Sequence, residues 1–122
     1  MEMDVIPVYK CFCDTQRLRI LNLLSRGPLC VCHLMEILDV DQVKMSKQLQ
    51  YMKKLGMLEV ERVAQWRIYR IVDSPSPLLE ENLRCLQDFA GEDLNFAGDL
   101  RRREEVLNRS ESDVLKACCV AV

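Results

Sequence analysis

The sequence contains one histidine, His33, and none of its seven cysteines forms a Cys-x-x-Cys pair. No Cys-x5-Arg loop follows a predicted strand, and there is no second histidine to serve as a base. Thiol oxidoreductases and arsenate reductases depend on such arrangements. We therefore predict that the protein is not an enzyme and needs no organic cofactor.

Long apolar runs are also missing, and Met1–Asp4 lacks the basic start and apolar stretch of a signal peptide. We therefore expect a soluble cytoplasmic protein with no membrane partner. Seven cysteines in that compartment do not form a disulfide framework, and an odd number cannot pair completely within one chain. Metal binding or thiol chemistry is thus a reasonable expectation for some of them, while buried inert thiols remain the alternative for each.

Charge is unevenly distributed along the 122 residues, although the net charge is only −2. Residues 41–70 carry seven basic and three acidic side chains, whereas residues 71–122 carry six basic and eleven acidic ones. The middle segment therefore has a net charge of +4, which suits either a polyanion-binding face or an ordinary solvated surface.

The periodicity of apolar residues predicts a winged helix-turn-helix, mainly α with a two-stranded β wing. The alternating segments "LEVERV" and "WRIYRIV" predict the wing, with a turn at Ala64-Gln65. Residues 1–110 form the expected DNA-binding domain, and residues 111–122 a flexible tail with cysteines. The flanking helices carry more apolar surface than one chain buries, which favours a homodimer. The predicted helices cover residues 16–25, 31–39, 42–55, 78–91 and 94–108.

The helix after Asp41 is the expected recognition helix, because its polar side chains suit base edges and phosphates in double-stranded operator DNA. Arginines on the wing strands are expected at the DNA backbone or minor groove. Tyr51 and Trp66 are expected to pack rather than stack on bases. The candidate DNA-binding residues are Gln42, Lys44, Ser46, Lys47, Gln50, Arg62 and Arg67.

Several stretches carry a family resemblance: "DTQRLRILNLL", "GPLCVCHL", "DQVKMSKQLQYMKKLGMLEVER" and "WRIYRI". Together they resemble the ArsR/SmtB family of bacterial metal-sensing repressors, over roughly residues 8 to 72. The resemblance implies a homodimeric repressor that leaves its operator when a metal or metalloid binds. Three positions depart from the arsenic-sensing pattern at the short helix: Pro28 replaces a Glu, His33 an Asp, and Met35 the third Cys. Further on, Ser46-Lys47-Gln48 replaces a Ser-x-His pattern, and Ala64 stands where the wing turn commonly has Gly.

Trivalent arsenic and antimony are the inducers that the resemblance implies, and both favour three thiolates. Cys30 and Cys32 are the expected first two ligands, at a helix start whose dipole favours the thiolate. The third ligand remains open among Cys11, Cys13, Cys118 and Cys119.

Other inputs also remain open. They are thiol oxidation, and a different soft metal such as cadmium or lead. Residues 76–91 contain no histidine, so a zinc site on the helix after the wing is not expected. His33 is expected at the surface, where it could still join Cys30 and Cys32 around a borderline ion. Cys85 is expected in the core.

Overall fold

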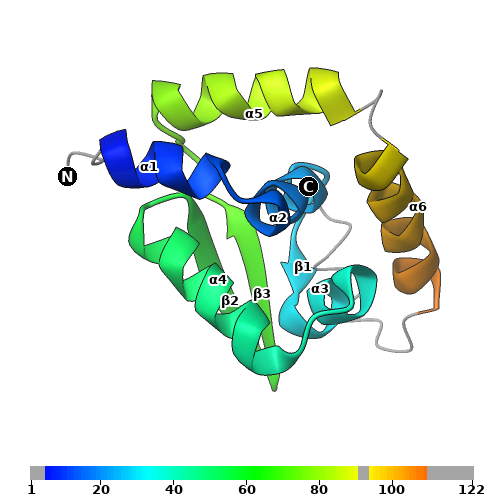
Figure 1. Ribbon diagram of the computed structural model, residues 1–122. Helices are drawn as coiled ribbons and strands as arrows, with labels where there is room; N and C mark the ends of the chain where they lie inside the picture. The colour runs from blue at the N-terminus through cyan, green and yellow to red at the C-terminus, as the bar shows by residue number, and fades with distance from the viewer. Residues whose placement is uncertain (1–4, 91–93, 110–122) are drawn as a thin grey trace.

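The computed structural model describes residues 5–90 and 94–109. Within them the chain forms six helices and a small antiparallel sheet, arranged as a winged helix-turn-helix (Figure 1). The helices are α1 (Val5–Phe12), α2 (Thr15–Leu24), α3 (Val31–Leu38), α4 (Gln42–Lys54), α5 (Pro77–Ala90) and α6 (Leu94–Asn108). The strands are β1 (Leu29–Cys30), β2 (Leu58–Val63) and β3 (Trp66–Ile71). The predicted fold class is confirmed.

Side-chain caps determine where the helices begin. Asp14 accepts a hydrogen bond from the backbone N–H of Arg17 at 3.0 Å, and Asp41 accepts one from Lys44 at 2.9 Å. These two aspartates are the N-caps of α2 and α4. Gly56 follows α4 with a φ of 83°, a backbone conformation that favours glycine.

The sheet has the strand order β1-β3-β2, so it contains one strand more than the predicted wing. Strand β1 has only two residues, Leu29 and Cys30, which pair with Tyr69 and Ile68 of β3. Its two side chains are both buried, so no alternation of apolar and polar residues reveals it in the sequence. The turn between β2 and β3 lies at Ala64-Gln65, as predicted.

One hydrophobic core joins the helices to the sheet. Leu21 of α2, Leu34 of α3, Leu49 of α4 and Ile68 of β3 all lie in it, with at most 2% of their surface exposed. In Figure 1, α5 passes over the molecule at the top, while α4 and α6 lie on opposite sides. Helix α6 packs against both α2 and α3.

The structure confirms the predicted packing of two aromatic residues and contradicts the predicted burial of one cysteine. Tyr51 and Trp66 are half-buried and pack against the core, as predicted. Cys85 is exposed, so its predicted place in the core is wrong. The face of α5 that buries Leu79 and Leu83 does not extend to Cys85.

None of the described helices is long and apolar enough to span a bilayer. The predicted tail, residues 111–122, lies outside the described residues.

Candidate thiol site and nucleic-acid interface

The sulfurs of Cys30 and Cys32 lie together at the start of α3, where the structure joins them as a disulfide with their Cα atoms 5.4 Å apart. Cys30 is both the end of β1 and the N-cap of α3, and its Sγ accepts a hydrogen bond from the backbone N–H of His33 at 3.3 Å. A ring nitrogen of His33 and the two sulfurs all lie within 4.8 Å of one another. The structure therefore brings the two predicted ligands together and adds a third donor.

His33 is buried, with 7% of its surface exposed, so the prediction that it lies on the surface is wrong. Burial lowers the pKa of its imidazole, the nearby Glu36 carboxylate opposes this, and the Arg103 guanidinium adds to the lowering. The neutral imidazole is thus favoured near pH 7, and this is the form that ligates a metal. A lone histidine gives no sign in the sequence that a later helix will cover it.

The other candidate thiols differ in environment. Cys11 is fully buried, and burial raises the pKa of its thiol to about 11, which disfavours the thiolate that a soft ion requires. Cys13 is free and exposed. Within the described part of the chain, neither joins Cys30 and Cys32 in a group of three ligand atoms. Cys118 and Cys119 lie outside the described residues.

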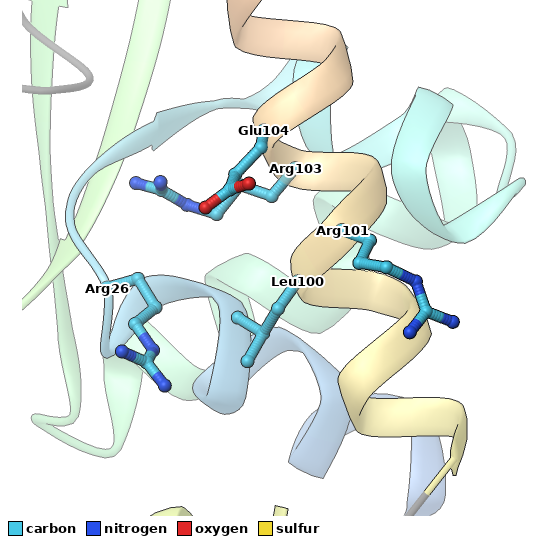
Figure 2. Close-up of a pocket in the computed structure, with 5 residues that line it drawn as sticks. All are labelled: Arg26, Leu100, Arg101, Arg103 and Glu104. Carbon is cyan, nitrogen blue, oxygen red and sulfur yellow. The ribbon is translucent and has the colours of Figure 1, made fainter. Parts of the chain in front are cut away.

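Helix α6 lies next to the thiol site and holds α3 in place. Arg102 donates a hydrogen bond to the backbone carbonyl of Glu36 at 3.0 Å, and Arg109 forms an ion pair with its carboxylate at 2.5 Å. A hollow of about 380 Å³ separates α6 from Arg26 at the end of α2. Figure 2 shows Arg103 reaching from α6 into the space between the helices, while Arg101 points away from it.

Helix α4 presents exposed side chains along residues 42–50. Gln42, Lys44, Lys47 and Gln50 are exposed, and Ser46 is half-buried, so all five predicted residues have surface that DNA can reach. Val43 lies between Gln42 and Lys44 with 64% of its surface exposed, and it is not among the predicted residues. The sequence does contain a sign of it, because Val43 is an apolar residue that lies outside the buried stripe of Met45, Leu49 and Met52. An aliphatic side chain at such a position suits the methyl group of thymine in the major groove.

The wing places Arg62 of β2 directly opposite Arg67 of β3. Like charges facing each other across two strands destabilise a sheet, unless an anion lies near both. Arg70, by contrast, is paired with Glu59 at 3.0 Å and Glu61 at 3.2 Å. The positive charge available to DNA phosphates on the wing therefore comes from the first two arginines.

The thiol site is connected to α4 by the short helix α3 and the two residues that follow Asp39. Helix α3 has eight residues, about 12 Å of helix at 1.5 Å per residue. It ends at Asp39 in a left-handed conformation with a φ of 55°, and Asp41 caps α4 two residues later. The start of α3 is therefore linked to α4 through packed helices rather than through a long loop.

This fold, with its exposed cationic helix and wing, defines a winged helix-turn-helix DNA-binding protein. The family described as "Bacterial regulatory protein, arsR family" matches residues 14–60. The chain is 33% identical over 108 residues to the arsenic resistance transcriptional regulator ArsR1 of Pseudomonas putida, covering 88% of this chain and 83% of that one. The chain belongs to the arsR family. It is a DNA-binding transcriptional repressor and not an enzyme, as predicted.

Two further comparisons agree with this assignment. The cadmium resistance transcriptional regulatory protein CadC homolog of Staphylococcus aureus is 32% identical over 72 residues, covering 58% of this chain and 60% of that one. A solution structure from Mycobacterium bovis, described as a homodimeric winged helix-turn-helix DNA-binding domain and a possible ArsR-family regulator, matches with a TM-score of 0.60. That match has 28% identity and covers 74% of this chain and 81% of the other.

Proposed function

We propose that the protein is a homodimeric repressor that leaves its operator when trivalent arsenic or antimony binds Cys30 and Cys32. The observation that carries this proposal is the meeting of both sulfurs at the first turn of α3, the helix that packs against the expected recognition helix α4. The arsenic resistance regulator among its relatives supports the choice of ion. A third thiolate completes the site from Cys13, Cys118 or Cys119, because the buried Cys11 thiol has a pKa of about 11.

Release requires the ion to bind the DNA-free conformation more tightly than the DNA-bound one. A third thiolate from outside α3 must pull the start of that helix toward itself. Because α3 and α4 pack together, this pull reorients α4 relative to the wing. The ion therefore acts on DNA affinity without contacting the DNA-reading side chains.

The dimer is supported by apolar side chains that one chain leaves in water. Ile6 of α1 has 60% of its surface exposed and Phe89 of α5 has 55%. Val5 and Tyr9 add to this surface on α1. Burial between two copies would remove all of them from water. A two-fold dimer then places its recognition helices on half-sites about 34–36 Å apart.

The test is operator binding, measured by fluorescence anisotropy on reduced protein titrated with arsenite. We expect wild type and Cys85→Ser to release the DNA, because Cys85 is exposed on a different helix. The double variant Cys30→Ser/Cys32→Ser should stay bound. Release from that variant, or retention by wild type, would overturn the proposal. The dimer is tested separately by light scattering, where Ile6→Glu/Phe89→Glu should halve the mass.

A second input is favoured by the disulfide between Cys30 and Cys32. In this alternative, peroxide oxidises the two thiols to the disulfide and is itself reduced to two water molecules. DNA release by peroxide in the absence of any metal ion, reversed by dithiothreitol, would favour it. Operator binding that is the same for oxidised and reduced protein would exclude it.

A further inference from the structure

The hollow between α2 and α6 contains none of the predicted thiol ligands or DNA-binding residues. It has a volume of about 380 Å³, and three arginines and one glutamate line it together with a leucine: Arg26, Arg101, Arg103, Glu104 and Leu100. Its lining therefore carries a net positive charge. We propose that this hollow binds a small oxyanion, the phosphate or carboxylate group of a small molecule, between Arg26 and Arg103. The inference goes beyond the proposed function, because it needs neither the thiols nor DNA.

Arg103 gives the hollow a permanent positive charge at its inner wall. Only 8% of its surface is exposed, and Figure 2 shows the side chain reaching from α6 into the space between the helices. A guanidinium keeps its charge even when it is buried, and salt screens it less there than at the surface. Its planar fork matches the oxygens of a carboxylate or phosphate, which it can bind in pairs. Arg103 is therefore the expected anchor of the anion.

Arg26 lines the hollow from the opposite side, just after the end of α2. Its side chain is exposed and forms no ion pair with the described residues, whereas Arg19 is paired with Asp99. The Arg26 guanidinium can therefore close over an anion that Arg103 holds. Arg101 is the third arginine of the lining, but it points away from the space between the helices. Two of the three arginines thus act on the same anion from opposite sides.

Contacts of α6 with α2 and α3 hold the walls of the hollow in place. Asn22 of α2 donates a hydrogen bond to the backbone carbonyl of Phe96 at 3.3 Å. Further along α6, Arg102 donates one to the backbone carbonyl of Glu36 in α3 at 3.0 Å. Because the two helices are already ordered, an anion does not have to supply the free energy of bringing them together.

The remaining lining residues indicate which anions fit. Leu100 is half-buried and provides an apolar wall, so the anionic group can belong to a small organic molecule as well as to inorganic phosphate. Glu104 is exposed on the same hollow and repels negative charge. Its carboxylate therefore opposes binding, and removing that charge should increase the affinity for any oxyanion.

The location of the site is tested by NMR on reduced, ¹⁵N-labelled wild-type protein without DNA. Inorganic phosphate and succinate are titrated separately, each at an ionic strength matched with chloride. We expect the backbone amide signals of residues 26–27 and 100–104 to shift with at least one of them. A response to both would show that any small oxyanion fits, and a response to one would identify that group. Shifts confined to α4 and the wing, or no shifts with either anion, would overturn the proposal.

Three substitutions at exposed positions then test the roles of the lining charges. Arg26→Gln should weaken binding of the responding anion at least about fivefold, because it removes one of the two guanidinium partners. Arg101→Gln is the matched control, since it removes the same charge from a side chain that points away, and its affinity should stay within about twofold of wild type. Glu104→Gln should bind more tightly than wild type.

Equal losses in Arg26→Gln and Arg101→Gln would mean that only the overall charge attracts the anion, and would contradict a site between Arg26 and Arg103. Weaker binding by Glu104→Gln would contradict it as well. These variants leave the buried Arg103 in place, so the test does not depend on whether a substitution there folds. None of the measurements involves arsenite or the operator, so failure of this inference leaves the proposed function untouched.

Discussion

Arg19 of α2 donates two hydrogen bonds of 2.7 Å to Asp99 of α6, one from Nε to Oδ2 and one from Nη2 to Oδ1. The Asp99 side chain has only 4% of its surface exposed, and Arg19 has 31%. This paired geometry raises the pKa of the arginine, chiefly through the hydrogen bonds to the carboxylate. It also attaches α6 to the helix-turn-helix across 80 residues of sequence.

Asp99→Ala should therefore destabilise the protein by about 3 kcal/mol, because it leaves a partly buried guanidinium without its carboxylate. The matched control is Glu80→Ala, which removes an exposed pair with Arg84 at 3.9 Å and should cost less than about 0.5 kcal/mol. Urea unfolding at one fixed chain concentration measures both. Similar losses in the two variants would mean that this contact does not anchor α6.

The exposed valine of the recognition helix gives a prediction about operator reading. Val43→Ala should weaken binding to the operator and leave binding to random DNA nearly unchanged, because a methyl contact acts on base edges and not on phosphates. Arg62→Ala on the wing should weaken both and reduce the slope of log affinity against log salt by about 1. Anisotropy titrations over a series of salt concentrations measure the two effects, with Arg84→Ala on α5 as the control.

If Val43→Ala weakened operator and random DNA equally, the valine would not read bases. If Arg62→Ala left the salt slope unchanged, the like-charged pair on the wing would need an explanation other than DNA phosphate. These two outcomes are independent, because the residues lie on different elements.

The buried Cys11 thiol predicts a stability effect at alkaline pH. Its pKa rises from 9.0 to about 11 on folding, mainly through burial. A raised pKa means that the folded state favours the neutral thiol, so its contribution is complete below pH 9 and is lost as pH rises from 9 to 11. At about 1.4 kcal/mol per pH unit, wild type should lose about 2 to 3 kcal/mol more than Cys11→Ala across this range. Denaturant unfolding at pH 8 and pH 11 provides the comparison.

The same environment predicts slow alkylation. Iodoacetamide at pH 8 should modify Cys13 quickly and Cys11 only when the protein opens, because Cys13 is exposed and Cys11 is not. Mass spectrometry of reduced protein resolves the two sites. Equal rates at both would show that Cys11 is accessible, and it would then return to the candidates for the third thiolate.

The helices and the wing could be predicted because each leaves a local pattern in the sequence. The caps at Asp14 and Asp41 and the alternation in β2 and β3 all lie within a few residues of what they determine. Strand β1 could not be predicted, because its two residues become a strand only by pairing with β3, almost forty positions later. The burial of His33 has the same origin, since α6 returns to cover α3 from the far end of the chain. Long-range packing thus decides the features that a local pattern misses.

The wing turn gives the last prediction. Ala64 has a φ of 55°, in the left-handed region where a side chain costs about 1 to 2 kcal/mol. Ala64→Gly removes that strain but gives the unfolded chain more freedom, so the net gain should be up to about 1 kcal/mol. The neighbouring Gln65 has no positive φ, so Gln65→Gly should instead cost about 0.5 to 1 kcal/mol. The free energies of unfolding of both variants, measured with a chemical denaturant, test this prediction. A loss of stability in Ala64→Gly would mean that the left-handed turn is not under strain.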